Sequence, residues 1–285
     1  MLSQRIKSSI AMLAIFIFTY FFLDSIFFEF LVLLLGGFLL FELSKILKLK
    51  GMNNWLYWVI AATPIVTHFL LSLSFSFAFF NSFLASYAPF LRHQIFEPYI
   101  LILIPLSLVF WFLIVPFDLV YKKISSNSVI KIFYGAVYIS PMLLTIMFIF
   151  WADKNLLFMI ILMIWLADIG AYFFGKRFGK IKIAKNISPG KTFEGLFGGF
   201  ISNIVFVLLW FTNANMNLID GFALAFLVTG LSLYGDIYES FLKRMAKIKD
   251  SSSMIPGHGG FLDRLDGFCP TIPILYILFE MFRYI

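Results

Sequence analysis

The stretch NLLFMIILMIWLADIGAYFF, residues 155–174, carries a single charged side chain, Asp168, in a run long enough to cross a bilayer. A helix needs about 20 apolar residues to span the hydrocarbon core. Similar runs recur along the whole chain, in which 61% of residues are hydrophobic and 13% are charged, unlike soluble domains. The runs are apolar on all sides instead of alternating in polarity, which argues against a β-barrel. We therefore expect an all-α fold, a polytopic membrane helix bundle.

About nine transmembrane helices are predicted. Their approximate limits are 8–22, 26–44, 54–71, 97–118, 130–150, 155–174, 193–211, 219–238 and 268–284. The first run follows a basic start like that of a signal peptide, but no small-residue cleavage site follows it, so we interpret it as a retained span. A tenth span at 72–96 stays open, because its alternation of serine with phenylalanine suits neither a lipid-facing helix nor a strand. We divide the chain into spans one to five, residues 1–150, and spans six to nine, residues 151–285.

The basic residues favour nine spans over ten, because Lys and Arg accumulate in cytoplasmic loops. With nine spans and a cytoplasmic N-terminus, all of the 22 basic residues except Arg92, Lys154 and Arg283 lie on the inner side. We expect a multi-pass protein of the inner (cytoplasmic) membrane. The loops 175–192 and 239–267 then share the cytoplasmic face, where they could build one site. Most of their basic residues are also explained by topological bias and by attraction to anionic headgroups.

The first of these loops follows Asp168, a carboxylate within a predicted span. Such a group is costly unless a cation, a metal or water meets it, so Asp168 is a functional candidate. The alternative is a pairing with Lys176 or Arg177. The segment SPGKT (188–192) is similar to the end of a Walker A motif, which we reject because Lys185 stands where glycine is required and no strand is expected before it. Ser188, Lys191 and Thr192 nevertheless offer phosphate-binding groups at the start of span seven.

The second loop gathers acidic residues from two segments. On a continuing helix, Asp236, Ser240 and Lys243 share one face, and Asp263 and Asp266 can also point the same way. Several carboxylates close together require a cation, and Mg²⁺ suits a few carboxylate oxygens completed by water and phosphate. Lys243, Arg244 and Lys191 would then bind phosphate oxygens. These residues together indicate a phosphate-transfer site.

Each of these residues also has a simpler explanation. Asp263 could be a helix N-cap, Pro256 and the neighbouring glycines a flexible turn, and His258 a loop histidine. The single Cys269 excludes a disulfide framework and a thiolate-rich metal site, and its apolar surroundings suggest a packing role. A short connection between membrane helices has no structural need for three acids, several bases and four turn formers, so we favour function for the set.

From Ser240 to Asp266 the chain resembles the signature of the phosphatidate cytidylyltransferases, also called CDP-diacylglycerol synthases. The matching residues are Ser240, Lys243-Arg244, Lys249-Asp250, Pro256, His258-Gly259-Gly260, Asp263-Arg264 and Asp266. The segments AYFFGKRFGK and SPGKT also resemble inner loops of that family, so the resemblance extends from about Asp168 to the C-terminus. It implies transfer of CMP from CTP to phosphatidate, giving CDP-diacylglycerol and pyrophosphate.

The resemblance also implies a metal centre at Asp236 and Asp263, with Mg²⁺ and, as an optional second ion, K⁺. The phosphate of phosphatidate is already an anionic nucleophile, so His258 is expected to position substrate instead of acting as an essential base. Catalytic roles are predicted for Asp236, Asp263, Asp266, Lys243, Arg244 and His258, and substrate contacts for Asp168, Ser188, Lys191, Thr192, Ser240, Lys249, Asp250 and Arg264. The expected partners are CTP, phosphatidate and the bilayer, without nucleic acid, and a homodimer is left open.

Two other functions remain as alternatives. A CTP-dependent lipid kinase would use the same nucleotide but transfer its γ-phosphate and release CDP. An ion-coupled transporter could also hold buried carboxylates, although it has no need of a basic, phosphate-suited loop. A CDP-alcohol phosphotransferase is disfavoured, because the chain contains no DGxxAR string.

Overall fold

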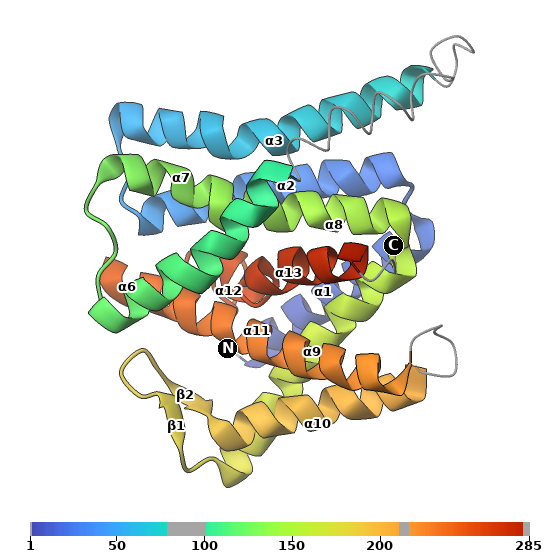
Figure 1. Ribbon diagram of the computed structural model, residues 1–285, viewed down its shortest axis with the longest axis vertical. Helices are drawn as coiled ribbons and strands as arrows, with labels where there is room; N and C mark the ends of the chain where they lie inside the picture. The colour runs from blue at the N-terminus through green and yellow to red at the C-terminus, as the bar shows by residue number, and fades with distance from the viewer. Residues whose placement is uncertain (1, 79–100, 211–216, 282–285) are drawn as a thin grey trace.

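The computed structural model describes residues 2–78, 101–210 and 217–281, and most of these residues are helical (Figure 1). In chain order the helices are α1 (Leu2–Phe22), α2 (Ser25–Ile46), α3 (Gly51–Ala78), α6 (Val115–Tyr121), α7 (Ser128–Tyr138), α8 (Ser140–Ala152), α9 (Lys154–Phe178), α10 (Phe193–Trp210), α11 (Leu218–Ala246), α12 (Leu262–Leu265) and α13 (Phe268–Met281). A π-helical stretch, η1 (Phe110–Ile114), leads directly into α6 within one continuous helix, Leu101–Tyr121.

Among the described residues, 6 helices are long and apolar enough to cross a membrane, which confirms a helical membrane protein. They are Ser25–Ile46, Leu101–Tyr121, Ser128–Ala152, Lys154–Phe178, Phe193–Trp210 and Leu218–Ala246. Helices α1, α3 and α13 coincide with the other three predicted spans but do not belong to this group, so the count of nine is not confirmed. Residues 72–78, part of the segment 72–96 that was left open as a tenth span, continue α3. The rest of that segment, which includes Arg92, and Arg283 lie outside the described residues.

Polar side chains fix where several helices begin. The Asp153 carboxylate accepts hydrogen bonds from the backbone N–H groups of Asn155 and Leu156, which starts α9. Asn217 starts α11 in the same manner by accepting from the Asp220 N–H. Such side-chain acceptors satisfy N–H groups that lack a partner within the helix. Predicted span five is divided into α7 and α8 just before Pro141, because proline has no N–H to continue the hydrogen-bond ladder.

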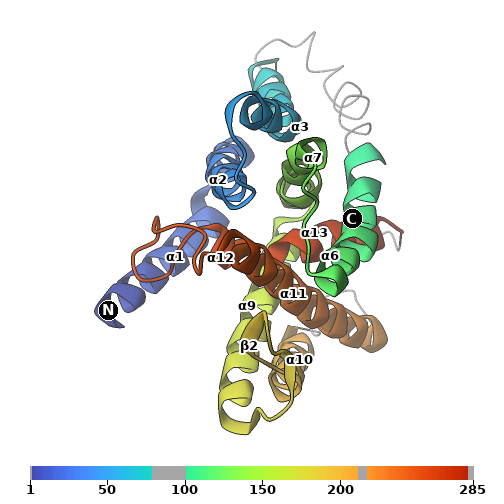
Figure 2. The same ribbon diagram turned by 90° about the vertical axis from the view of Figure 1, so that its left-hand side faces the viewer.

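Glycines bring α9 and α10 together. A Cβ added to Gly170 would overlap the backbone oxygen of Gly198, and one added to Gly199 would lie 2.7 Å from the backbone oxygen of Ala167. Small residues at such positions let two helix backbones approach closely within a membrane. This close pairing carries the start of α10 to the end of α9, and the two helices run side by side in both views (Figures 1 and 2).

Between these helices lies an antiparallel hairpin of β1 (Lys182–Ala184) and β2 (Ser188–Thr192), which the all-α prediction did not include. The SPGKT segment is therefore a strand, so the sequence-based expectation that no strand occurs here was wrong. The rejection of a Walker A motif still rests on Lys185, which stands where that motif needs glycine. At the base of the hairpin, the Glu194 carboxylate accepts from the Lys180 N–H at 3.0 Å and the Ile181 N–H at 3.3 Å.

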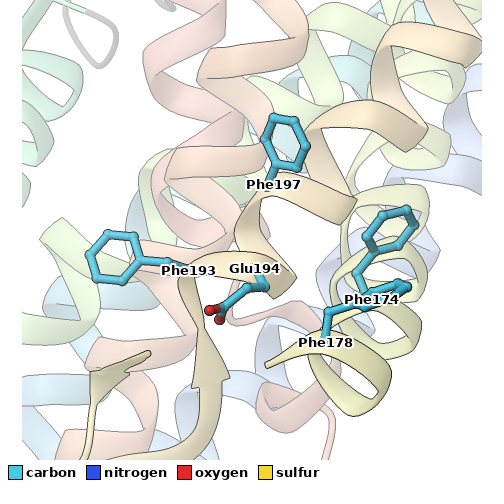
Figure 3. Close-up of a pocket in the computed structure, with 5 residues that line it drawn as sticks. All are labelled: Phe174, Phe178, Phe193, Glu194 and Phe197. Atoms are coloured by element: carbon cyan, nitrogen blue, oxygen red, sulfur yellow. The ribbon is translucent and has the colours of Figure 1, made fainter. Parts of the chain in front are cut away.

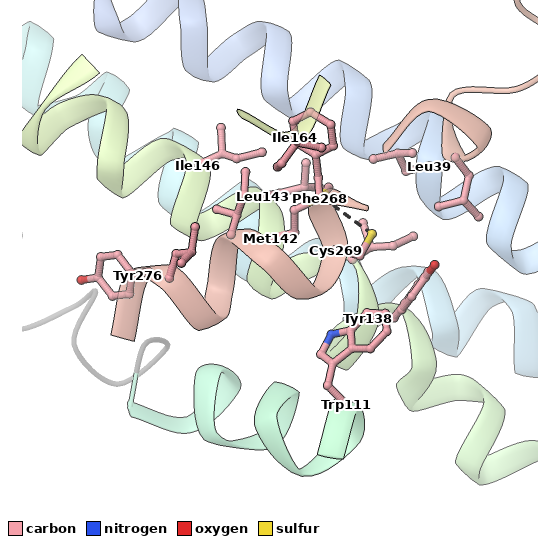
Figure 4. Close-up of a cluster of buried hydrophobic side chains, with 14 of the residues drawn as sticks. Leu39, Trp111, Tyr138, Met142, Leu143, Ile146, Ile164, Phe268, Cys269 and Tyr276 are labelled. Atoms are coloured by element: carbon pink, nitrogen blue, oxygen red, sulfur yellow. Dashed lines mark hydrogen bonds between the residues drawn. The ribbon is translucent and has the colours of Figure 1, made fainter. Parts of the chain in front are cut away.

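The buried core joins the two halves of the chain. Asp118 on α6 is buried, and its carboxylate accepts hydrogen bonds from the hydroxyls of Tyr134 at 2.8 Å and Tyr238 at 2.9 Å. Cys269 on α13 is also buried, and its thiol lies 3.7 Å from the Met142 sulfur on α8 (Figure 4). The predicted packing role of Cys269 is thereby confirmed.

The two motif loops lie at one end of the bundle, together with two other connections. The turn between α2 and α3, the link from α6 to α7, the hairpin and the loop after α11 all lie on the left in Figure 1 and toward the viewer in Figure 2. The beginning of α9 and the C-terminal end of α13 lie at the opposite end (Figure 1). The two predicted motif loops therefore share one end of the molecule.

Candidate active site

The loop from Lys247 to Phe261, here called the signature loop, follows α11 and ends at α12. Helix α11 stops at Lys247, whose φ of 64° is left-handed. A tight turn follows later in the loop, where the Ile255 N–H donates to the Gly259 backbone oxygen at 2.8 Å. Gly257 and Gly259 have φ values of 76° and 87° there, a backbone region that favours glycine. The predicted turn at these residues is confirmed, and backbone hydrogen bonds fix it.

Asp263 lies at the base of the signature loop on α12. Its carboxylate accepts from the Gly260 N–H at 2.8 Å, from the Ser251 N–H at 2.9 Å and from the Ser251 hydroxyl at 3.0 Å. Burial by itself raises the pKa of this carboxyl, but the hydrogen bonds from Lys243 and the loop backbone outweigh it, so the pKa is lowered. Asp263 is therefore held as a carboxylate that organises the loop around it.

Lys243 on α11 lies between two carboxylates, which we call the Lys243 cluster. Its ammonium is 2.5 Å from Asp263 Oδ1 and 2.5 Å from Glu239 Oε2. The Glu239 side chain is fully buried. Sequence reasoning missed Glu239, although its i, i+4 spacing from Lys243 on a helix was a usable signal. The Lys243 cluster ties the end of α11 to α12.

A second group, the Lys191 cluster, is centred on the strand β2. The Lys191 ammonium forms an ion pair with Asp236 on α11, and Ser240 donates a hydrogen bond to the same carboxylate at 3.3 Å. The predicted shared face of Asp236 and Ser240 is thus confirmed. Burial lowers the pKa of Lys191, but the charges of Asp236 and Asp168 more than offset this effect, and its pKa is raised.

Asp266 and Asp168 complete the Lys191 cluster. Burial raises the pKa of Asp266 well above its usual value, and the nearby charges of Asp236 and Asp168 raise it further. Within the described part of the chain no ion pair joins Asp168 to Lys176 or Arg177, whose cationic groups lie over the rings of Tyr172 and Phe178. Three carboxyl groups therefore lie in the field of the Lys191 ammonium, and Arg264 is a second cation that acts on Asp168, so acidic groups outnumber cationic ones here.

Two predicted residues, Arg264 on α12 and His258 in the signature loop, hold the conformation of that loop. The Arg264 guanidinium donates to the His258 backbone oxygen at 2.9 Å. The His258 ring nitrogen Nδ1 lies 2.6 Å from the Ser8 hydroxyl of α1, which also donates to the Pro256 backbone oxygen at 3.2 Å. The sequence analysis gave no role to Ser8, because nothing in the sequence indicates that α1 packs against this loop.

Of the other predicted residues, some form hydrogen bonds within the protein and others are exposed. Arg244 is exposed and donates to the Ile248 backbone oxygen at 3.4 Å, which caps the end of α11. Thr192 is buried, and its hydroxyl accepts from the Gly195 N–H at 3.1 Å, so it caps α10. Lys249 and Asp250 are exposed in the signature loop, and Ser188 pairs with Ala184 in the hairpin. Their predicted substrate contacts stay predictions.

An apolar groove lies beside the hairpin, outside both clusters. It has a volume of about 410 Å³ and is lined by Phe174, Phe178, Phe193, Glu194 and Phe197 (Figure 3). The Glu194 carboxylate accepts hydrogen bonds from the hairpin backbone. The other four lining residues are phenylalanines. None of the residues predicted to act in phosphate transfer lines this groove.

Carboxylate oxygens are suitable ligands for Mg²⁺, and the excess negative charge around Lys191 fits a divalent cation. Over residues 2–78, 101–210 and 217–281, no three Asp, Glu, His or Cys side chains are arranged to hold a metal ion by themselves. An ion at this site would therefore use one or two carboxylates and complete its coordination with water and phosphate oxygens, as Mg²⁺ usually does. The donor set fits Mg²⁺ on these terms.

Comparison with known proteins identifies similar chains. A phosphatidate cytidylyltransferase of Haemophilus influenzae is 44% identical over 124 residues, covering 41% of this chain and 43% of that protein. Proteins of the same name from Staphylococcus aureus and Pseudomonas aeruginosa are 42% identical over 119 residues and 41% identical over 128 residues. These matches cover 46% and 47% of those proteins, so the chain spans less than half the length of each relative. A sequence model described as "Cytidylyltransferase family" matches residues 3–282, and the chain therefore belongs to that family.

Proposed function

We propose that this protein transfers CMP from CTP to phosphatidate, forming CDP-diacylglycerol and pyrophosphate in phospholipid biosynthesis. Membership of the cytidylyltransferase family and the names of the similar proteins support this reaction. The observation that carries it is the Lys191 cluster, in which Asp236 pairs with the Lys191 ammonium and the charges of Asp168 and Asp266 also act on it. Such a concentration of acidic groups at the end of a membrane bundle suits a cation, which in turn can hold the phosphates of a nucleotide.

The reaction balances without a strong general base. A phosphate oxygen of phosphatidate attacks the α-phosphorus of CTP, and the bond from that phosphorus to the oxygen bridging the β-phosphorus breaks. Pyrophosphate leaves with the bonding electron pair, and its charge must be neutralised. Lys191 and Lys243 supply positive charge at the two clusters, so their role is to bind phosphate oxygens and to orient the reacting groups.

We propose Asp236 and Asp263 as the residues that hold Mg²⁺, with K⁺ as an optional second ion. Bound there, Mg²⁺ would neutralise charge on the triphosphate. Both carboxylates are now neutralised by lysine, Asp236 by Lys191 and Asp263 by Lys243. In the loaded enzyme these lysines would be released from their carboxylates and become available to phosphate oxygens. The pKa of Asp266 is raised by burial first and then by the charges of Asp236 and Asp168, so a cation at this place would favour its ionised form.

The proposed topology has nine spans, with the N-terminus and both motif loops on the cytoplasmic side of the inner membrane. The clustering of the basic loops at one end of the bundle supports this orientation. CTP would reach the site from the cytoplasm and phosphatidate from the bilayer. Single cysteines at Lys185 and at Asn155, placed in a Cys269→Ala background, test it with a membrane-impermeant thiol reagent on intact spheroplasts. Labelling of position 185 from the outside would contradict the orientation, whereas labelling of position 155 alone is expected.

The reaction is tested with purified protein, phosphatidate, Mg²⁺ and CTP labelled at the α-phosphorus. CMP transfer moves the label into the lipid fraction and releases unlabelled pyrophosphate. A CTP-dependent lipid kinase would leave the label in CDP and would label the lipid only when the γ-phosphorus of CTP carries the isotope. An ion-coupled transporter would give neither product. Label in CDP, or no transfer at all, would therefore reject the proposed function.

A further inference from the structure

Glu42 on α2 is a buried carboxylate that contacts the signature loop from the first half of the chain. Its side chain has 0% exposure. The Ser252 hydroxyl donates to Glu42 Oε1 at 2.6 Å, and the Ser251 hydroxyl lies 2.9 Å from Oε2. The backbone N–H groups of Phe261 and Leu262 donate to Oε1 at 3.0 Å and to Oε2 at 2.8 Å. The Glu42 carboxylate thus contacts four polar groups of the signature loop and the start of α12, and three of these donate to Glu42 alone.

These contacts compensate for burying the charge. No ion pair involves Glu42 in the described part of the chain, so these hydrogen bonds take the place of a cation. A buried carboxylate is tolerated only when its oxygens are hydrogen-bonded, and hydrogen bonds to a charged acceptor are stronger than neutral ones. Glu42 therefore holds Ser251 of the signature loop next to Leu262, the first residue of α12.

Glu42 is also coupled to Asp263. The Ser251 hydroxyl oxygen lies 2.9 Å from Glu42 Oε2 and 3.0 Å from Asp263 Oδ2. A serine hydroxyl has one proton, so it can donate to only one of these carboxylates at a time. Both carboxylates contact the same Ser251 hydroxyl, so the position of one carboxylate depends on the position of the other.

The backbone at Gly260 is shaped to this arrangement. A Cβ at that position would overlap the Ser251 hydroxyl oxygen and both carboxylate oxygens of Glu42. Next to it, the ring of Phe261 stacks on Phe38 of α2 with centroids 5.2 Å apart. The glycine at position 260 is therefore required by the close approach of the carboxylate, and the stacked rings seal the loop against α2.

We propose that Glu42 is a positioning residue of the nucleotidyl-transfer site: it fixes the signature loop, and through Ser251 it fixes the Asp263 carboxylate in its reacting place. This inference rests on the proposed function for its effect on turnover, whereas its effect on the loop can be measured without any reaction. The first half of the chain thus contributes to the site directly, beyond anchoring it in the bilayer.

The test compares Glu42→Gln and Glu42→Asp with Glu29→Gln. Glu29 is a matched control, because it is another fully buried carboxylate on α2 but receives its hydrogen bond from Trp151 and contacts His68, far from the loop in sequence. In Glu42→Gln the amide N–H₂ group opposes donors that need an acceptor. A displacement of about 1 Å near reacting groups can reduce turnover about 100-fold, so kcat should fall strongly and the KM for CTP much less. Glu42→Asp keeps the charge and should recover part of the loss, while Glu29→Gln should retain kcat.

Amide hydrogen exchange, measured on the protein without substrates, separates this inference from the proposed function. The amides of Phe261 and Leu262 should exchange faster in Glu42→Gln than in wild type and be unaffected in Glu29→Gln. Equal exchange in wild type and Glu42→Gln, or an equal loss of kcat in Glu42→Gln and Glu29→Gln, would overturn the role of Glu42. If the wild-type protein transfers no CMP, the proposed function is rejected. The exchange result still decides whether Glu42 positions the loop. If Glu42→Gln does not fold, Ser252→Ala removes a single donor to Glu42 and must show the same faster exchange at Phe261.

Discussion

Lys243 Nζ lies 2.5 Å from Asp263 Oδ1, a contact that joins the last turns of α11 to the short helix α12. Helix α11 also carries Asp236, and α12 leads to Asp266, so this ion pair links the two segments that supply carboxyl groups to the Lys191 cluster. Removing one partner from such a partly buried pair leaves the other without full compensation. The consequences can be measured for each residue in turn.

Asp263→Asn should abolish CTP turnover while the protein remains folded. The amide matches the carboxylate in shape but cannot neutralise Lys243, and its N–H₂ group faces the donors of Gly260 and Ser251. Loss of one electrostatic contact to a developing charge reduces turnover by about 100-fold or more. Initial rates of pyrophosphate release, with circular dichroism as a check of folding, measure the effect. Glu29→Gln is the control, because Glu29 is a buried carboxylate outside the site, and a near-normal rate for Asp263→Asn would contradict the metal assignment.

Asp236→Asn should likewise remove turnover and should also remove the response of the protein to Mg²⁺. A ligand that binds only the folded protein raises its apparent stability in proportion to occupancy. Mg²⁺ should therefore raise the Tm of the wild-type protein in detergent and have no such effect on Asp236→Asn. Thermal melts at several Mg²⁺ concentrations make this comparison without any substrate. Glu29→Gln, which alters a buried carboxylate outside the site, should keep the wild-type response.

Lys191→Ala should weaken substrate use by less than either aspartate substitution. One phosphate contact among several is lost, and a hydrogen bond to a charged group contributes about 1.5–3 kcal/mol, or roughly 10-fold to 100-fold in kcat/KM. The KM for CTP should rise more than kcat falls, because the contact acts on the bound triphosphate. Lys185→Ala is the matched control, an exposed lysine in the same hairpin. A loss as large as that of Asp236→Asn would instead indicate that Lys191 is needed mainly to hold Asp236.

The sequence predicted most helices, because runs of apolar residues have one stable arrangement in a bilayer. It did not predict the hairpin, since SPGKT contains proline and glycine, both poor strand formers, and the pairing of Lys182 with Thr192 is a tertiary choice. The extension of α3 to Ala78 was missed for a related reason: alternating serine and phenylalanine has the period of a strand, yet the residues continue a helix already formed.

For the site, the sequence indicated residues that lie close together along one helix or loop. Asp236 with Ser240 follows from helical spacing, and the turn at Gly257 and Gly259 follows from composition. The contributions of Glu42 and Ser8 could not be predicted, because they depend on α2 and α1 packing against a loop more than 200 residues away. The two glutamates in the apolar run of α2, Glu29 and Glu42, were the available signal, and the sequence gave no indication of the partners of Glu42.

Asp266→Asn should raise stability at neutral pH while it lowers turnover. The pKa of Asp266 is raised, by burial first and by Asp236 and Asp168 next. A carboxyl with a higher pKa in the folded state contributes stability below its unfolded pKa, about 3.9, and this contribution is lost as pH rises through the folded pKa. Asparagine does not ionise, so its advantage in Tm should be large at pH 7 and shrink toward pH 4. A variant that is less stable than wild type at pH 7 would contradict this account.

Asp263 provides the contrast of opposite sign. Its pKa is lowered in the folded protein, so its carboxylate contributes stability above the unfolded value, and that contribution is lost as pH falls through the folded pKa. The Tm deficit of Asp263→Asn should therefore be largest at pH 7 and shrink in acid. Melting the two variants beside wild type over the same pH series distinguishes a carboxylate whose charge stabilises the folded protein, Asp263, from one whose charge destabilises it, Asp266.

Ser8→Ala should reduce kcat/KM by a few fold through the signature loop. The Ser8 hydroxyl lies 2.6 Å from His258 Nδ1 and donates to the Pro256 backbone oxygen, so it fixes the turn that contains His258. A net hydrogen bond contributes about 0.5–1.5 kcal/mol, which corresponds to roughly 2-fold to 10-fold in kcat/KM. Thr19→Ala is the control, since its hydroxyl bonds within α1 to the Phe16 backbone oxygen. If α1 only anchors the chain in the bilayer, the two variants should behave alike; a loss confined to Ser8→Ala, with faster amide exchange at His258, assigns α1 a part in positioning the loop.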